Sequence, residues 1–519
     1  MTTATLNCRN RSKLKSDLET GIYDIVIIGG GITGAGVARD AVLRGLSVAL
    51  IEAQDFASGT SSRSSKMIHG GLRYLIQGDI PVVKESASER ATLHRIAPHL
   101  AKRSSYVLTA KSLKEELALR AALLVYEKLG KVAKIDHHER WSLSHLQQEE
   151  PRLDTTGVRS AIVYPEYLTD DARLTLANVR DAVAHGAVAA NYWRAEKLEK
   201  KSGIFSVSVS SMLPGDAHSA TVRAKAVLNA AGPWVDAVCN LESKSYRPKL
   251  ALSRGVHVVV PHATLPVNNT VVMSTPDKRK TFAVPNGRFT YIGTTDEFYP
   301  HSDYWPEVKR SDIDYLFDTT TKYFPSCLLM QGDIVSVWSG VRPLVGSTDQ
   351  KATEISRKDE MWYGDLGVLS IGGGKLSAYR AMAERIVNKL VQDNGFSASG
   401  CQTSERPLPG GEPYPNNGPT DTQSERWRSL YGSEAEIVSS YGEGLAAEVQ
   451  FAVEHEGAVR LEDYWVRRSS RAWFDDNAGL DTLEPAAAIM GDLLSWSESR
   501  LKEEINHCLR IDALSRAGL

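Results

Sequence analysis

A glycine-rich turn between two short apolar runs limits most strongly what this chain can fold into. Residues 23–52 read YDIVIIGGGITGAGVARDAVLRGLSVALIE. The β-branched run 25–28 predicts a strand that is buried on both faces, as in a parallel sheet. A helical pattern follows the glycines, and residues 46–51 predict a second strand. This order of strand, tight turn, helix and strand is typical of the first unit of a dinucleotide-binding α/β domain.

The glycines fit the pattern G-x-G-x-x-G, and each has a physical reason. Gly29 allows the tight turn, Gly31 lets a pyrophosphate approach the backbone, and Gly34 lets the helix pack closely on the strand. The helix N-terminus would direct free N–H groups at the phosphates. Glu52 ends the second strand, where its carboxylate can accept hydrogen bonds from ribose hydroxyls. The motif predicts a dinucleotide without distinguishing NAD from FAD, and its alternative is a glycine-rich turn in an ordinary α/β domain.

The next segment, GTSSRSSKMIHGGLRYL over residues 59–75, is crowded with small hydroxyl residues. Hydroxyls and loop N–H groups suit a second set of phosphate contacts, as the extended pyrophosphate of a flavin requires. The alternative is a solvated serine-rich loop. The candidate cofactor contacts here are Thr60, Ser61, Ser62, Lys66 and His69.

The composition suits a soluble globular protein and argues against several other classes. Apolar residues make up 42% of the 519 residues and charged residues 24%, and the length favours more than one domain. A formal net charge of −2 provides no global field for nucleic acid, and no apolar run approaches the ~20 residues that span a bilayer. Five scattered cysteines without CxxC spacing predict neither a disulfide framework nor a zinc site, and we expect no metal and a reducing compartment.

Further motifs follow one another in the order of a known family. They are IGGGITGAG from Ile28, TSSRSSKMIHGGLRYL from Thr60, DDARL from Asp170, NAAGPWV from Asn229, RGVHVVVP from Arg254, IGTTD from Ile292, SGVRPL from Ser339, GGGKLSAYR from Gly372 and WVRR from Trp465. In these motifs the sequence resembles the FAD-dependent, respiratory (aerobic) glycerol-3-phosphate dehydrogenases. The resemblance extends from about Tyr23 to the C-terminal region.

The resemblance implies an α/β fold with three parts. An FAD-binding Rossmann-like domain of the amino-acid-oxidase type is expected to be interleaved with an antiparallel-sheet substrate domain over 22–406, and a C-terminal helical domain is expected over 422–519. Residues 407–421 are rich in Pro, Gly and Asn and predict a linker. Residues 1–21 are polar and basic, lack the apolar stretch of a signal peptide, and are expected to form a short flexible arm.

The resemblance also implies a phosphorylated substrate, which guanidinium groups suit because their planar fork can contact two oxygens. Three arginines are candidates: Arg342 in SGVRPL, Arg73 after HGGL, and Arg357 in EISRKDE. Arg342 ranks first because it lies in the apolar run VWSGVRPLV, where a buried charge needs a partner. Tyr74 is expected to add a phenol hydrogen bond or to form part of the pocket wall.

Two histidines are candidates for the group that removes the hydroxyl proton. His257 interrupts the apolar strand RGVHVVV, and His69 precedes the Gly-Gly pair of HGGL. An imidazole suits the role because its ordinary pKa lies near neutrality. His257 can equally be a satisfied pocket-wall residue, and His69 can serve only to position the flavin. We count Arg342 with these two as the candidate catalytic residues.

Two further glycine turns are expected to contact the flavin. Gly373 and Gly374 end a strand before a helix, whose N-terminus would direct positive potential at the ring edge that becomes negative on reduction. Lys375 adds a full charge and is also a candidate substrate contact. Gly232 in AAGPWV belongs to a turn that, by resemblance, contacts the adenine half. The alternative for the first turn is a plain glycine turn with Lys375 solvated.

The resemblance, taken with these features, implies FAD-dependent oxidation of sn-glycerol 3-phosphate to dihydroxyacetone phosphate, by hydride transfer to flavin N5. The resemblance implies a quinone as the electron acceptor. Three alternatives stay open: the same chemistry on a longer polyol phosphate such as erythritol phosphate, an oxidase that uses oxygen, and a flavin-binding protein without turnover. No nucleic-acid partner is expected, and the sequence is compatible with a homodimer.

A quinone acceptor implies a cytoplasmic protein that is peripheral on the inner face of the membrane. The candidate contact is the segment 111–134, KSLKEELALRAALLVYEKLGKVAK. Its apolar stripe at helical spacing consists of Leu113, Leu117, Ala121 and Leu124. Charged residues lie on or beside this stripe, and an ordinary core-facing helix is the alternative.

Overall fold

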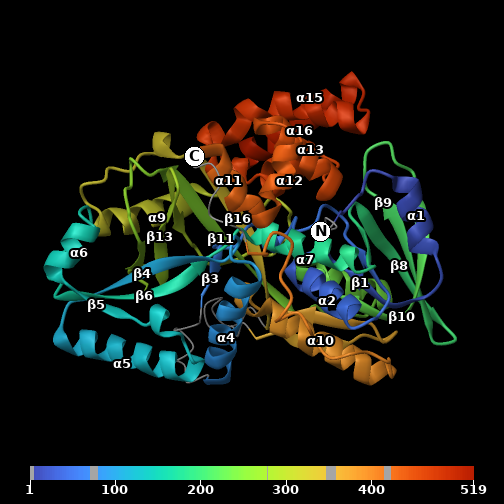
Figure 1. Ribbon diagram of the computed structural model, residues 1–519, viewed down its shortest axis with the longest axis horizontal. Helices are drawn as coiled ribbons and strands as arrows, with labels where there is room; N and C mark the ends of the chain where they lie inside the picture. The colour runs from blue at the N-terminus through green and yellow to red at the C-terminus, as the bar shows by residue number, and fades with distance from the viewer. Residues whose placement is uncertain (1–4, 70–79, 278, 347–357, 414–421) are drawn as a thin grey trace.

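The computed structural model describes residues 5–69, 80–277, 279–346, 358–413 and 422–519. In these residues the chain forms two sheets that lie side by side, and a group of C-terminal helices lies across the top of the view in Figure 1. This arrangement matches the predicted α/β fold with two interleaved sheet domains and a C-terminal helical domain.

The first sheet contains the strands predicted around the glycine turn. β1 (Tyr23–Ile28) pairs in parallel with β2 (Val48–Ile51) on one side and with β10 (Ser219–Asn229) on the other. Further parallel strands are β7 (Val188–Ala190) and β18 (Leu369–Gly372), and antiparallel strands are β8 (Trp193–Lys201), β9 (Ile204–Ser211) and β17 (Glu360–Tyr363). The run 25–27 has no exposed surface, as a strand covered on both faces requires.

Three helices pack together beside this sheet. α2 (Ile32–Leu43) starts directly after the glycine turn and contacts both α7 (Asp171–Ala184) and α10 (Tyr379–Asn394). α2 is buried over most of its length, as expected for a helix between other elements, and its two charged residues, Arg39 and Asp40, form buried ion pairs with Asp181 and Arg44. α8 (Val235–Glu242) follows the turn at Gly232.

The second sheet is antiparallel apart from one pair, β12 with β4. In this sheet β11 (Leu250–Pro261) pairs with β14 (Phe289–Gly293) and with β16 (Ser336–Val345). The others are β3 (Met67–Ile68), β4 (Lys102–Ala110), β5 (Glu139–Ser142), β6 (Ser160–Leu168), β12 (Thr270–Ser274), β13 (Lys280–Asn286) and β15 (Glu297–Phe298). The helices beside this sheet are α4 (Ile80–Ile96), α5 (Leu113–Gly130), α6 (Leu143–Glu149) and α9 (Arg310–Tyr323).

The C-terminal part is helical, as predicted. Its helices are α11 (Thr422–Tyr431), α12 (Ala435–Ser440), α13 (Gly444–His455), α14 (Arg471–Phe474), α15 (Leu483–Leu494) and α16 (Glu498–Ser515). A π-helical turn, η7 (Asp463–Arg468), carries the WVRR motif into the interior, where all six of its residues are buried. None of the helices in the described ranges is both long enough and apolar enough to cross a membrane.

The expectation of a flexible N-terminal arm is wrong for residues 5–19. Residues 11–19 form helix α1 (Arg11–Glu19), and Leu6 and Cys8 upstream of it are buried. The Arg11 guanidinium donates to the backbone oxygens of Asn191 and Tyr192 at 2.9 and 3.1 Å. The polar composition concealed a few apolar residues at helical spacing, which are enough to dock a short helix on a larger surface.

The described part of the predicted linker, residues 407–413, is packed against the protein. Leu408 is 1% exposed and its N–H donates to the oxygen of Ile96. The Gly410 turn lies so close to Tyr431 that a Cβ would come within 2.3 Å of the Tyr431 oxygen.

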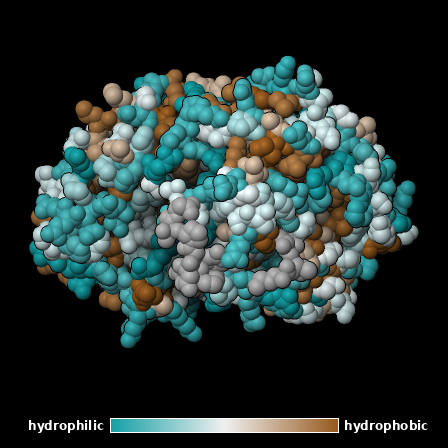
Figure 2. Space-filling view, turned by 45° about the horizontal axis from the view of Figure 1, so that its top comes forward, coloured by the Kyte–Doolittle hydropathy of each residue, from teal (hydrophilic) through white to brown (hydrophobic). Residues whose placement is uncertain are grey.

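Figure 2 shows a surface that is mostly hydrophilic on the side facing the viewer, with apolar side chains in separate small groups.

Candidate active site

A cavity of about 670 Å³ is lined by residues of both sheets. One end is lined by the glycine turn, Glu52 and the hydroxyl-rich segment, and the other end reaches strands β11 and β16 of the second sheet. The residues predicted from sequence that line it are Gly29, Gly31, Glu52, Thr60, Ser61, His69, Gly232, His257, Arg342, Gly373, Gly374 and Lys375. The fold therefore gathers segments from most of the chain around one space.

The glycine turn leaves room only for hydrogen at its key positions. Gly29 has φ +113°, and a Cβ there would lie 2.5 Å from the Ala230 oxygen. A Cβ on Gly34 would lie 1.9 Å from the Gly29 oxygen, so this residue sets how closely α2 approaches β1. Gly31 caps the N-terminus of α2 and lines the cavity. The first turn of α2 thus directs its N–H groups toward the cavity, as a site for phosphate requires.

Glu52 lies at the end of β2 and is held by backbone donors. Its two carboxylate oxygens accept from the N–H groups of Gly30 at 2.7 Å and of Gln54 at 2.8 Å. Burial raises the pKa of Glu52, although these two N–H groups act in the opposite direction. A carboxylate has about four acceptor positions, so Glu52 retains capacity for hydroxyl donors from a ligand.

Only some residues of the hydroxyl-rich segment line the cavity. Thr60 and Ser61 line the cavity, and the Ser61 hydroxyl accepts from the N–H of Ile32 at 2.9 Å. Ser62 and Lys66 do not line it. Lys66 is 5% exposed, and its ammonium forms an ion pair with Asp171 at 2.6 Å. The structure thus pairs the charge of Lys66 with Asp171, which lines the cavity, and this differs from the predicted direct contact with a cofactor.

The turn at Gly373 and Gly374 closes another part of the cavity. Both residues have positive φ, +76° and +93°, and a Cβ on Gly373 would lie 2.4 Å from the Lys358 oxygen. Lys375 follows at the N-cap of a short 3₁₀ helix that leads directly into α10. Positive potential from this helix start and from Lys375 therefore faces the same region.

His257 is buried in the second sheet at the far end of the cavity. Its ring stacks on Trp338 with centroids 4.8 Å apart, and its Nε2 lies 2.9 Å from the Ser65 hydroxyl. Its Nδ1 has no hydrogen-bond partner among the described residues. Burial, helped by the positive charges of Arg342 and Lys66, lowers the pKa of His257 well below its usual value. The imidazole is therefore neutral near pH 7.

Arg342 lies on β16, opposite Ser253 of the neighbouring strand. Its guanidinium pairs with Asp296 at 3.1 Å and donates to the Thr294 hydroxyl at 2.9 Å. The side chain keeps 19% of its surface exposed toward the cavity that it lines. The partner that the apolar context of Arg342 requires is thus Asp296.

Three of the predicted substrate contacts, Arg73, Tyr74 and Arg357, lie outside the described residues. His69, the rival candidate for the base, lines the cavity at the edge of the described range. The structure therefore brings His257 and Arg342 together on paired strands and gives no information on these three.

Sequence reasoning missed Arg63 and Tyr304, which also line the cavity. Tyr304 stacks on Trp234 with centroids 4.2 Å apart. Arg63 lies over the Trp305 ring at 3.8 Å and donates to the Tyr304 oxygen, while its Nε and Nη2 have no hydrogen-bond partner in the described ranges. Burial lowers the pKa of Arg63 to about 9. A charged arginine inside a hydroxyl-rich motif was the available signal.

The cavity fits an extended dinucleotide. A glycine turn without room for a Cβ, a helix N-terminus, a carboxylate at a strand end and a second glycine turn all line one cavity. The first glycine turn and the helix N-terminus would hold a pyrophosphate, the carboxylate would hold a ribose, and the second glycine turn would lie against a flavin ring. FAD would supply the capacity to accept a hydride.

Comparison with known proteins agrees with this geometry. A family model described as FAD dependent oxidoreductase matches residues 24–380, and one described as C-terminal domain of alpha-glycerophosphate oxidase matches residues 401–501. The chain is 35% identical over 544 residues to an aerobic glycerol-3-phosphate dehydrogenase of Staphylococcus aureus, and the alignment covers 97% of both proteins.

Solved structures show the same relationship. The glycerol-3-phosphate dehydrogenase of Bacillus halodurans in complex with FAD matches with a TM-score of 0.81 and 31% identity, over 100% of this chain and 99% of that one. The L-alpha-glycerophosphate oxidase of Mycoplasma pneumoniae with FAD bound matches with a TM-score of 0.56 and 16% identity, over 75% of this chain and 100% of that one, and shares the fold. The chain therefore belongs to the FAD-dependent oxidoreductases, within the glycerol-3-phosphate dehydrogenase and oxidase family, and its cofactor is FAD.

Proposed function

We propose that this enzyme oxidises sn-glycerol 3-phosphate to dihydroxyacetone phosphate and passes the electrons to a quinone. The observation that carries the proposal is the pairing of β11 with β16, which puts a neutral buried imidazole, His257, and a guanidinium, Arg342, on one wall of the FAD cavity. A small phosphorylated alcohol needs both groups: a cation for its phosphate and an acceptor for its hydroxyl proton.

Arg342 would bind the substrate phosphate. Its present partner, Asp296, carries one negative charge, whereas a phosphate ester carries close to two near neutral pH. Asp296 at 3.1 Å and the Thr294 hydroxyl at 2.9 Å fix the orientation of the guanidinium, whose planar fork suits the oxygens of a phosphate. Lys375 would add positive charge to the same space from the opposite turn.

His257 would take the hydroxyl proton as the substrate carbon gives up its hydride. The two electrons leave with the hydride, and the proton goes to the imidazole, so the product is a ketone. A base must be unprotonated before the reaction, and the lowered pKa of His257 keeps it so. Ser65 accepts from or donates to its Nε2 and holds the ring in place. His69 stays the alternative base.

The quinone acceptor and membrane contact are supported by the surface of helix α5. Leu113, Leu117 and Leu124 of this helix are 51%, 52% and 51% exposed, whereas Leu123 and Tyr126 on its other side are buried. The predicted stripe thus faces outward instead of into a core, at the lower left of Figure 1. An exposed apolar helix face suits attachment to a lipid surface, where a quinone is found.

An oxygen-using reaction is the second candidate, favoured by the match of residues 401–501 to a domain described from an oxidase. Steady-state assays should compare glycerol 3-phosphate with erythritol 4-phosphate, each with a quinone analogue and with oxygen as acceptor. The proposal expects turnover with glycerol 3-phosphate and the quinone analogue. Hydrogen peroxide formation at an equal rate without quinone would favour the oxidase, and turnover only with the longer substrate would replace the assigned substrate.

A further inference from the structure

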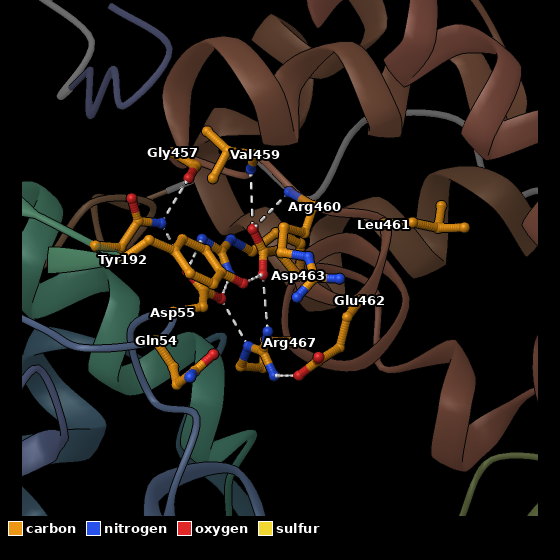
Figure 3. A network of polar contacts seen from close by, with 12 residues as sticks. Gln54, Asp55, Tyr192, Gly457, Val459, Arg460, Leu461, Glu462, Asp463 and Arg467 are labelled. Atoms are coloured by element: carbon orange, nitrogen blue, oxygen red, sulfur yellow. Dashed lines mark hydrogen bonds and ion pairs between the residues drawn. The ribbon is translucent and has the colours of Figure 1, made fainter. Parts of the chain in front are cut away.

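The C-terminal helices contact the cofactor domain through an ion-pair cluster that the catalytic proposal does not use. Arg467 and Arg468 of η7 are 1% and 0% exposed. Both bind Asp55: Arg467 Nε lies 2.6 Å from its Oδ2, and Arg468 Nη2 lies 2.9 Å from its Oδ1, with Nη1 also in contact (Figure 3). Burial acts to raise the pKa of Asp55, but the two arginines outweigh it and lower that pKa.

Asp55 belongs to the segment that forms the wall of the FAD cavity. It follows Glu52 by three positions and precedes Thr60 and Ser61. Glu52, Thr60 and Ser61 line the cavity. Asp55 itself does not line it. The segment is held on its other side by the Ala57 N–H, which donates to the Gly30 oxygen at 3.1 Å. The arginines therefore fix one side of a segment whose other side contacts the glycine turn.

A second link joins the same turn to the same segment. The Tyr192 hydroxyl donates to Asp463 of η7 at 2.6 Å, and the Tyr192 N–H donates to the Gln54 oxygen at 2.8 Å. Asn191 adds a third link, since its amide donates both to Asp55 and to the Gly457 oxygen at 3.0 Å. Figure 3 shows Asp463 and Arg467 of the C-terminal part meeting Tyr192 and Asp55 of the cofactor domain.

We propose that Arg467, Arg468 and Asp463 are positioning residues for the cofactor: through Asp55 and Gln54, the docked C-terminal domain holds segment 52–61 in the conformation that binds FAD. Replacing a buried ion cluster by apolar packing often costs no stability, so stability alone does not explain such a cluster. The cluster is explained if it holds segment 52–61, which follows the end of β2, in one fixed conformation. The C-terminal domain is then part of the cofactor site, although no residue of it lines the cavity.

A general structural role must be separated from a positioning role, and the chain offers a matched control. Arg180 of α7 forms a bidentate pair with Glu434 at 2.7 and 2.9 Å. This pair also joins the cofactor domain to the C-terminal helices and is also buried, but neither Arg180 nor Glu434 belongs to segment 52–61. Arg180 donates to the His455 oxygen and lies 4.0 Å from Glu456, on the C-terminal side of the interface. Arg180→Gln and Arg468→Gln should therefore cause a similar loss of thermal stability and differ in their effect on FAD.

The experiment measures FAD release from the holoenzyme on dilution, by flavin fluorescence, at a temperature where each variant is folded. The expected result is a dissociation constant raised about tenfold in Arg468→Gln, within the usual range of coupling between sites, and little changed in Arg180→Gln. Equal changes in both variants, or an unchanged constant in Arg468→Gln, would overturn the proposal.

A milder variant keeps the proposal testable where Arg468→Gln fails to fold. Arg468→Lys retains the charge but cannot contact both oxygens of Asp55 in the planar geometry of a guanidinium. Its FAD constant should rise in the same direction by a smaller factor. Because coupling between sites is reciprocal, hydrogen exchange across 456–470 in the wild-type protein should be slower with FAD bound than after FAD is removed. Identical exchange in the two states, or an unchanged constant in Arg468→Lys, would contradict the proposal.

Discussion

The end of the cavity near Glu52 is built mainly from backbone groups, whereas the end near Arg342 is built from side chains on paired strands. At the first end, the cavity is lined by glycine positions without room for a Cβ, by the N-terminus of α2 and by Glu52, whose carboxylate is held by backbone N–H groups. At the second, His257 and Arg342 depend on Trp338, Ser65 and Asp296 for their orientation. Substitutions at the two ends should therefore act differently. At the first end they should disturb the backbone by steric clash, and at the second they should remove a charge or a proton acceptor.

The largest expected effect comes from adding one methyl group at the backbone end. Gly34→Ala would put a Cβ 1.9 Å from the Gly29 oxygen, a backbone atom that cannot move without shifting β1 or α2. We expect a destabilisation of about 3 kcal/mol or more and purified protein without bound flavin. Gly45→Ala is the control for adding a methyl group near α2 without a steric clash, since no atom lies within 4 Å of its Cβ position. Its φ of +91° adds backbone strain, so this variant should lose some stability and still bind FAD. Retention of FAD at wild-type affinity in Gly34→Ala would show that the turn is less constrained than its geometry indicates.

The next effect tests the proposed base. His257→Asn should keep FAD bound, because His257 lies on β11 of the second sheet whereas the glycine turn and Glu52 belong to the first, and should lower kcat by about 10²–10⁴-fold. The measurement is the rate of flavin reduction in single-turnover experiments. A loss of less than about fivefold, well under the range for general-base help, would transfer the role to His69.

Arg342→Gln should have a smaller effect and a different kinetic pattern. Removing a charge-assisted contact to the substrate phosphate costs about 1.5–3 kcal/mol, which predicts a KM for glycerol 3-phosphate raised about 10–100-fold. FAD affinity should change little. Because Asp296 would be left buried without this cation, Arg342→Gln combined with Asp296→Asn serves as a control for that loss. Equal losses of substrate and FAD affinity would show that Arg342 supports the cofactor instead.

The smallest expected effect is a pH dependence of stability. The folded-state pKa of His257 lies below its unfolded value of about 6.5, so the unfolded protein binds more protons below that pH. The contribution of His257 to stability is therefore complete above about pH 6.5 and is lost as the pH falls, by up to about 1.4 kcal/mol per pH unit. Denaturant unfolding of the FAD-free protein between pH 7.5 and about 5 should show a shallower decline in His257→Asn than in the wild type. Parallel declines would contradict a neutral buried imidazole.

The same contrast explains how much could be predicted from the sequence. The backbone end follows from local order, because strand, glycine turn, helix and terminal acid are consecutive in residues 23–52. Arg342 was predicted as a charge needing a partner, but only the register of β11 and β16 and the turn after β14 bring Asp296 to it. Sequence spacing contains no such register.

Other contacts had no local signal at all. Arg467 and Asp55 are separated by 412 residues, so the WVRR motif was visible while its role in bracing the cofactor domain was not. Lys66 was assigned to the cofactor because it lies among hydroxyls, but it is buried and pairs with Asp171 at the start of α7. The buried N-terminal segment was missed because Leu6 and Cys8 are isolated among polar residues and gain their burial from other domains.

The central claim is that one cavity holds FAD at its backbone end and a small phosphorylated alcohol at its Arg342 end. The most direct test is an anaerobic titration of the purified holoenzyme with sn-glycerol 3-phosphate, followed by the flavin absorbance, with glycerol and inorganic phosphate as controls. The account predicts that glycerol 3-phosphate bleaches the flavin band stoichiometrically and that neither control does. A flavin band that persists at saturating glycerol 3-phosphate would contradict it.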